Sequence, residues 1–261
     1  MKKIFILLVI IAVSENINAQ SLIGGNHILK TNLSADALQN YNITFEKSLN
    51  HFMSISASYS TMPSRTLPLQ SLAKNFIDNP NINFDNFKIS NSAFTLESRF
   101  YLGLQKMSGI YIAPYARFGN LEVNVPVNYQ YTYTPTAPNG TPLSPLSVAT
   151  TANLKGPIRS QSVGAYFGMQ FQLLTKLVLD FWVIGGHYGS SNGKLQFDAP
   201  AGTPAVALDE LKKVVDQTKA HPFNLSSSIV NNSDGTKSLV TNTDGPWLGI
   251  RGAGLTLGLR F

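Results

Sequence analysis

The sequence predicts an all-β fold, an eight-stranded antiparallel transmembrane β-barrel with long extracellular loops. Three observations lead to this prediction. The first is the stretch 253–261, in which apolar residues alternate with small or polar ones. Because successive side chains of a strand point to opposite faces, this stretch forms a strand with one apolar face. That face carries Ala253, Leu255, Leu257, Leu259 and Phe261.

The second observation is the composition. Hydrophobic residues make up 43% of the 261 residues and charged residues only 13%, which is about half of the usual charged share. No stretch offers about eighteen continuous apolar residues, so a helical membrane protein is excluded. Few charges without a long apolar run fit a barrel whose outer wall faces lipid.

The third observation is the alternation of long and short connections. Long connections are predicted at residues 61–88, 120–158 and 189–245, and tight turns separate them at 105–109 and 174–176. If both termini lie in the periplasm, every long connection faces outward. Bacterial barrels show this asymmetry of short periplasmic turns and longer extracellular loops, whereas a soluble sandwich has no reason to maintain it.

Residues 1–19 are predicted to be a signal peptide. Two lysines precede an apolar run from Ile4 to Val13, and Asn18 and Ala19 follow as a small-residue cleavage site. The run is too short to span a bilayer, so it indicates a removable export signal. The barrel domain is then residues 20–261.

The charge balance bears on the partners. The formal net charge is +6, but the sequence holds no dense Lys/Arg run, and export also argues against nucleic acid as a partner. Lipopolysaccharide phosphates and outer-membrane lipid are the expected partners for the excess positive charge. The chain has no cysteine, which excludes disulfides and thiolate metal sites. We expect no metal and no cofactor.

Strands follow from the period of two in the hydrophobic pattern. They are predicted at residues 27–36, 40–47, 52–60, 89–103, 110–118, 159–173, 177–183 and 247–261. Further alternation predicts that strand pairing continues beyond the membrane at Val127, Tyr129, Tyr131 and Tyr133. The ring has ten strands instead of eight if this segment pairs within the membrane.

The last long connection contains two structural signals. Thr203 is predicted to cap a helix that has Pro204 at its first position. Apolar residues then follow at helical spacing: Leu208, Leu211 and Val215. Further on, the sequence Ser233-Asp234-Gly235 lies between two alternating segments and predicts a β-hairpin.

The inward face of the barrel carries charges of both signs. When the apolar face of each strand is assigned to lipid, seven charged residues fall in the lumen: Lys30, Glu46, Glu97, Arg99, Arg117, Asp180 and Arg260. The interior of an eight-stranded barrel is just wide enough for side chains to fill. We therefore interpret the set as a lumen-filling ion-pair network. A narrow polar pore and a proton relay or catalytic site stay open as alternatives.

The terminal strand resembles the closing strand of bacterial outer-membrane β-barrels, in which a final Phe follows alternating apolar residues. The resemblance implies that Leu255, Leu257, Leu259 and Phe261 are an insertion signal. It also implies that the barrel assembly machinery of a Gram-negative cell is a partner. The whole pattern resembles the small outer-membrane barrel family of outer membrane protein X and the outer membrane protein A membrane domain. The loops here are longer and match no motif, so their ligand stays unknown.

One segment bears on catalysis. His187 to Gly193 resembles the His-x-Ser-Asn-x-Gly stretch of lipid A deacylases, in which His activates Ser. Here an extra residue separates His187 from Ser190, and strand positions three apart face opposite sides. We therefore expect no enzyme.

The expected function is a non-enzymatic structural or surface-interaction role in the outer membrane, with a lumen filled by side chains. The first alternative is a porin-like transporter of a small solute or hydrophobic ligand. The remaining alternative is a lipid A-modifying enzyme.

Overall fold

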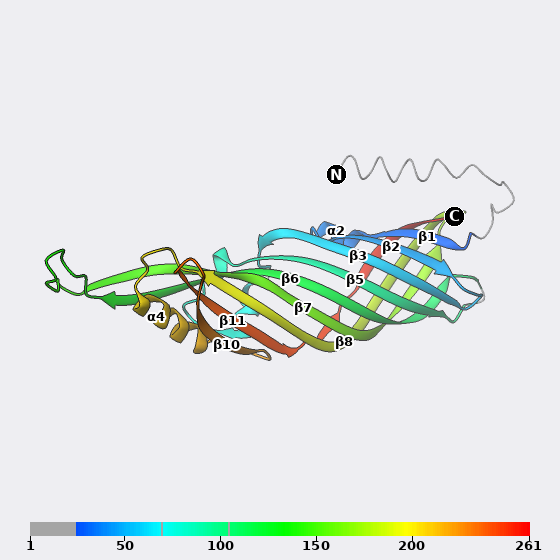
Figure 1. Ribbon diagram of the computed structural model, residues 1–261. Coiled ribbons are helices and arrows are strands. Elements are labelled where there is room, and N and C mark those ends of the chain that lie inside the picture. Colours follow the sequence, from blue (N-terminus) through cyan, green and yellow to red (C-terminus); the bar gives the residue numbers. More distant parts are fainter. Residues whose placement is uncertain (1–24, 69, 104) are drawn as a thin grey trace.

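The computed structural model describes residues 25–68, 70–103 and 105–261. The predicted signal peptide, residues 1–19, lies outside the described residues. In Figure 1 a closed barrel forms one end of an elongated molecule, and several of its strands continue into an extension that carries helix α4. The C terminus lies at the barrel end, away from α4.

Eight strands close into an antiparallel ring in which each strand pairs with the next. They are β1 (His27–Asn32), β2 (Tyr41–Ser48), β3 (Met53–Thr66), β5 (Lys88–Tyr101), β6 (Gly109–Tyr133), β7 (Leu146–Gln172), β8 (Leu177–Asp198) and β13 (Gly254–Arg260). The ring closes where β13 pairs with β8 on one side and with β1 on the other. The predicted barrel is confirmed, with eight strands rather than ten.

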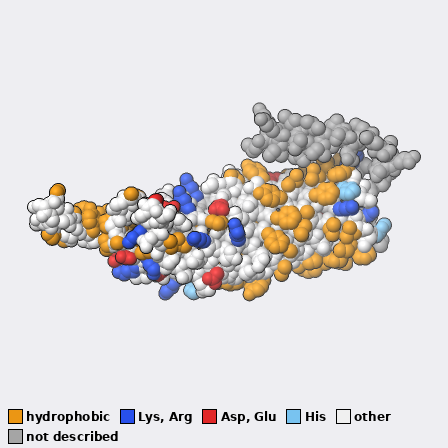
Figure 2. All heavy atoms as spheres, in the orientation of Figure 1, with side chains coloured by type: hydrophobic (Ala, Val, Ile, Leu, Met, Phe, Trp, Pro, Cys, Tyr) orange, Lys and Arg blue, Asp and Glu red, His pale blue; other side chains and the backbone are white. Residues whose placement is uncertain are grey.

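The outer wall of the barrel is apolar. In β13, Thr256, Gly258 and Arg260 are buried, while Leu259 is 50% exposed and Phe261, which follows the strand, is 45% exposed. In β3, the even-numbered serines 54–60 are buried and Ile55 and Tyr59 are exposed. On the face that Figure 2 shows, hydrophobic side chains gather on the barrel end, whereas most charged side chains lie on the other half. An apolar belt of this extent suits contact with hydrocarbon. Its exposed members include Ile43, Phe45, Ile55, Tyr59, Phe94, Leu96, Ile112, Phe118, Phe167, Phe181, Val183, Leu259 and Phe261.

The extension continues the strands of the ring. The β6–β7 ladder runs on to the pair Tyr133–Leu146, which confirms the strand pairing predicted beyond the membrane. Three strands follow one another along the same edge of β8. Residues 190–198 of β8 pair with β11 (Lys237–Pro246), residues 185–187 with β12 (Gly249–Arg251), and residues 177–182 with β13. The predicted long connections 120–158 and 189–245 are therefore made largely of strands and of helix α4 (Ala205–Asp216). These strands stay extended because one face of each is buried in a second hydrophobic core.

That second core defines a unit that we name the cap, made of the strand extensions, helix α4 (Ala205–Asp216), β10 (Asn224–Asn231) and β11. The predicted helix and the predicted hairpin are both confirmed. The N-cap is Pro204, however, not Thr203, because the Thr203 hydroxyl donates to the Pro200 carbonyl at 2.7 Å instead. The buried residues of the cap include Val123, Val127, Leu154, Leu195, Leu208, Leu211, Val215 and Leu239.

Short elements complete the chain. They are α2 (Leu33–Ala37), α3 (Gln70–Ala73), β4 (Ile77–Asp78), the 3-10 turn η1 (Phe84–Asn86) and β9 (Lys219–Ala220), which pairs with β4. Within the described residues, no helix is long and apolar enough to cross a membrane.

The predicted strand 27–36 is wrong in its second half, where α2 forms. Asn32 is the N-cap, and its side chain accepts a hydrogen bond from the Ala35 N–H at 3.0 Å. Thr31 also donates to Asp36 at 2.6 Å. These side-chain contacts satisfy the first turn of the helix and end the strand.

The cap core supplies a first testable prediction. Leu211 is fully buried, so Leu211→Ala should destabilise the cap by about 2–5 kcal/mol. Hydrogen exchange of α4 and β10 should accelerate, while the heat-dependent gel shift of the barrel stays unchanged. Lys213→Ala, at an exposed position of the same helix, is the control. Equal acceleration in both variants would show that α4 is not held by this core.

Candidate functional site

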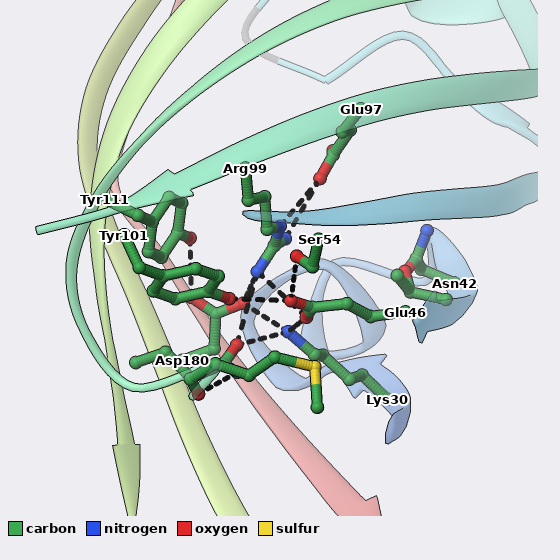
Figure 3. Close-up of polar contacts among 12 residues, drawn as sticks. Lys30, Asn42, Glu46, Ser54, Glu97, Arg99, Tyr101, Tyr111 and Asp180 are labelled. Carbon is green, nitrogen blue, oxygen red and sulfur yellow. Dashed lines mark hydrogen bonds and ion pairs between the residues drawn. The ribbon is translucent and has the colours of Figure 1, made fainter. Parts of the chain in front are cut away.

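The structure brings five of the seven predicted lumen charges into one buried cluster (Figure 3). They come from β1, β2, β5 and β8, and none is more than 5% exposed. We name this set, together with the partners described below, the lumen cluster. Its five predicted members are Lys30, Glu46, Glu97, Arg99 and Asp180.

Asp180 lies at the centre of the cluster. Its Oδ2 accepts from Lys30 Nζ at 3.0 Å and from Arg99 Nη1 at 2.6 Å, and its Oδ1 accepts from the Tyr111 hydroxyl at 2.6 Å. Gln170 lies beside them, where its side-chain carbonyl accepts from both cations. Two cations and a phenol therefore compensate this carboxylate, which is fully buried.

Glu46 forms the second part of the cluster. It pairs with Lys30 and lies 3.5 Å from Arg99 Nη1. Its Oε1 accepts from the hydroxyls of Ser54 at 2.5 Å and Tyr101 at 2.6 Å. Lys30 and Glu46 can pair because β1 and β2 are neighbouring strands of the ring.

Glu97 is bound by two arginines, of which sequence reasoning found only one. Arg99 Nη2 lies 2.9 Å from Oε2, and the Tyr166 hydroxyl donates to the same oxygen at 2.7 Å. Arg251, from β12, lies 3.5 Å from Oε1. Its guanidinium is also 4.5–5.2 Å from the ring centres of Tyr115, Tyr166 and Trp182. Such cation–π contacts stabilise a partly desolvated arginine.

Arg251 was missed for a reason that the structure makes clear. An unbroken count by twos along the last strand places Arg251 on the same face as Phe261, the outer one. Residues 252 and 253 separate β12 from β13, and this break reverses the face on which the side chain lies. The glycine at 252 was the one available signal for it.

The other two predicted charges do not join the cluster. Arg260 is buried, but it donates to the Gly25 carbonyl and to Gln172, both at 2.8 Å, at the end of the barrel near the C terminus. Arg117 is partly exposed and makes no hydrogen bond or ion pair with any described residue. The two residues lie towards opposite ends of the barrel. Arg260 is the last residue of β13, near the C terminus, whereas Arg117 pairs with Ser162 on the side of Asp180 that faces the cap.

Aromatic side chains fill the lumen around the cluster. Tyr111 lies opposite Gly168 in the β6–β7 ladder, and Trp182 lies opposite Gly254 in the β8–β13 ladder. A Cβ atom at Gly168 would come within 2.4 Å of the Tyr111 hydroxyl, and one at Gly254 within 1.9 Å of the Trp182 ring. A large ring on one strand therefore requires a residue without a side chain on the next.

The cluster is formally neutral. Its carboxylates are Glu46, Glu97 and Asp180, and its cations are Lys30, Arg99 and Arg251. Every ring strand except β13 contributes a side chain, since Ser54 comes from β3, Tyr111 from β6 and Tyr166 from β7. The arrangement can hold the strands together and block the passage of ions.

The segment that resembles a deacylase motif shows no dyad. His187 lies against Gly249 on the inward face, whereas Ser190 is exposed and is contacted by Gln161 at 3.4 Å. In the described residues no hydrogen bond joins His187 to Ser190. Nor does this part of the chain contain a group of three or more His, Asp or Glu side chains that could hold a metal ion.

The ion pairs of the cluster are testable by mutation. Glu46→Gln should lower the stability of the folded barrel by about 3–5 kcal/mol, because Lys30 and Arg99 lose part of their compensation. Combining it with Lys30→Met restores neutrality and should cost far less. Thermal unfolding in detergent, followed by the gel shift, measures both. Glu122→Gln, outside the cluster, is the control. Simple additivity of the two single losses would refute the pairing.

The comparisons with known proteins identify the family. No curated protein matches the sequence. Among solved structures, the outer membrane protease OmpT from Escherichia coli is similar at 11% identity, with 91% of this chain and 94% of that chain covered and a TM-score of 0.30. A FadL homologue from Pseudomonas aeruginosa is similar at 8% identity, with 85% and 78% covered and a TM-score of 0.26. Residues 4–221 match the family described as "Protein of unknown function (DUF3575)", and the chain belongs to that family.

Proposed function

We propose that this protein is a non-enzymatic barrel of the bacterial outer membrane with a structural or surface-interaction role. The observation that carries the proposal is the lumen cluster, a neutral and buried set of ion pairs that spans the barrel. The cluster and its aromatic neighbours fill the cross-section of the lumen. The surfaces left for the binding of partners are therefore the outer wall and the cap.

Three features support the location. The apolar belt surrounds the barrel end (Figure 2), and the last strand carries alternating apolar residues on its outer face. The signal peptide proposed for residues 1–19 would export the chain. In this orientation the termini and the short turns lie in the periplasm, and the cap lies outside the cell. The resemblance to outer membrane protein X and the outer membrane protein A membrane domain points to the same role.

The barrel assembly machinery and outer-membrane lipid, including lipopolysaccharide, are the partners that this location implies. The cap would present its surface to an external ligand, whose identity is open. A porin-like transporter and a lipid A-modifying enzyme are the alternative functions. We rank them lower because the lumen is filled and because His187 and Ser190 lie on opposite faces.

Conductance tests the filled lumen directly. The purified barrel should give no steady single-channel current in planar bilayers, since ions have no hydrated path through paired charges and packed rings. The heat-dependent gel shift of the same preparation confirms that folded protein was inserted. A reproducible unitary conductance would contradict the proposal and favour the transporter. A change in lipid A mass on expression would favour the enzyme instead.

The proposed insertion signal gives a second test. Phe261→Asp places a charge at the lipid-facing edge of the ring, where Phe261 is 45% exposed and stacks on His27 at 5.8 Å. The variant should disappear from the outer membrane and accumulate as unfolded or degraded periplasmic protein. Phe261→Tyr keeps the aromatic ring and is the control. Normal outer-membrane levels of the Asp variant, measured by fractionation and protease resistance, would argue against an insertion role.

A further inference from the structure

A groove of about 530 Å³ lies on the outer wall of the barrel, outside the lumen. It crosses β3, β5, β6, β7 and β8, at the junction between the apolar belt and the more polar half of the molecule. Figure 2 shows this junction as the boundary between the hydrophobic belt and the region where charged side chains gather.

The lower edge of the groove is aromatic. Tyr59 pairs with Phe94 in the β3–β5 ladder, and Phe94 pairs with Phe118 in the β5–β6 ladder. The three rings therefore lie side by side on adjacent strands. They are 50%, 41% and 51% exposed. This row continues the apolar belt and offers a surface for hydrocarbon chains.

The upper edge of the groove is polar and carries one cation. Two residues further along each strand, Ser92 pairs with Asn120, Asn120 with Arg159, and Arg159 with Asn192. The step of two residues separates the two rows by about 7 Å along the strand. A lipid at the membrane surface has the same arrangement, with its headgroup just above its acyl chains.

Two side chains of the polar row have unused bonding capacity. Arg159 is exposed and has no hydrogen-bond or ion-pair partner among the described residues. The Oδ1 atom of Asn120 is buried and likewise has no partner in the described part of the chain. Neither nearby carboxylate pairs with Arg159 in the described part of the chain: Glu122 accepts a hydrogen bond from Asn120 Nδ2 within the row, and Asp244 accepts one from Asn224, both at 3.1 Å.

We propose that this groove binds an anionic phospholipid or glycolipid of the surrounding leaflet, one whose headgroup carries hydroxyls. Arg159 binds the phosphate, Asn120 Oδ1 accepts a hydrogen bond from a headgroup hydroxyl, and the row of Tyr59, Phe94 and Phe118 contacts the acyl chain. The inference rests on the proposed membrane location. A free phosphate ion would bind Arg159 but would leave the aromatic row without a partner. Only a lipid contacts both rows, so we assign the groove to a lipid.

The test is a binding titration of the purified full-length barrel in neutral detergent, followed by native mass spectrometry. Phosphatidylglycerol, which carries a phosphate and two hydroxyls, should bind at one site more tightly than phosphatidylcholine. Arg159→Gln should weaken phosphatidylglycerol binding by about fivefold, the effect of one cation near a membrane surface. Asn120→Ala should weaken phosphatidylglycerol but leave phosphatidylmethanol, which lacks the hydroxyls, unchanged.

Lys213→Gln removes the same charge from an exposed position on α4 and should not affect binding. Unchanged affinity in Arg159→Gln would overturn the site, and displacement of the lipid by excess inorganic phosphate would overturn its assignment to a lipid. The gel shift verifies that each variant is folded. Absence of phosphatidylglycerol selectivity in the wild-type protein, when it is folded, non-conducting and located in the outer membrane, refutes this inference alone. Absence of the wild type from the outer membrane refutes the proposed function instead.

Discussion

Charges inside the lumen have to compensate one another, and the rest of the barrel depends on this constraint. An isolated charge removed from water is strongly disfavoured. Here each buried carboxylate faces at least one cation, and hydroxyls of serine and tyrosine occupy the remaining acceptor sites. Because the partners come from seven ring strands, the ion pairs also determine how the strands are placed around the lumen.

The same interior is shaped by the fit of large rings against glycine. Tyr111 occupies the space above Gly168, and Trp182 occupies the space beside Gly254. The rings then pack edge to face, with the centre of the Tyr166 ring 5.9 Å from that of Tyr111 and 6.2 Å from that of Trp182. Together with Arg99 over Tyr111 at 4.8 Å, they enclose the charges of the cluster, of which Arg251 is the most exposed, at 23% of its side chain. Because the lumen is filled, the outer wall and the cap are the surfaces that a partner can contact.

The two ends of the molecule follow opposite rules of burial. In the barrel, the inward face is polar and the apolar face points outward, as expected where lipid is the solvent. In the cap, the same strands turn apolar residues inward, against α4, as in a water-soluble domain. The aromatic row and Arg159 lie where one rule gives way to the other. The same strands pass from lipid at the barrel to water at the cap. This explains why aromatic rings and a cation lie close together at the boundary.

The sequence by itself determined the all-β class, the eight-stranded ring and the inward position of Lys30, Glu46, Glu97, Arg99 and Asp180. It did so because the period of two assigns each residue to a face wherever a strand is unbroken. It missed Arg251, since the break at residues 252 and 253 reverses the face. It also missed helix α2, which is capped by the local side-chain contact of Asn32 with the Ala35 N–H. It predicted continued strand pairing at residues 127–133 but no second core, because the alternating residues of the extensions become a core only when α4 covers them. Which charged side chains form ion pairs depends on the closure of the ring. A face is a local property of the backbone, whereas a partner such as Tyr166 or Gln170 comes from a strand more than a hundred residues from Lys30.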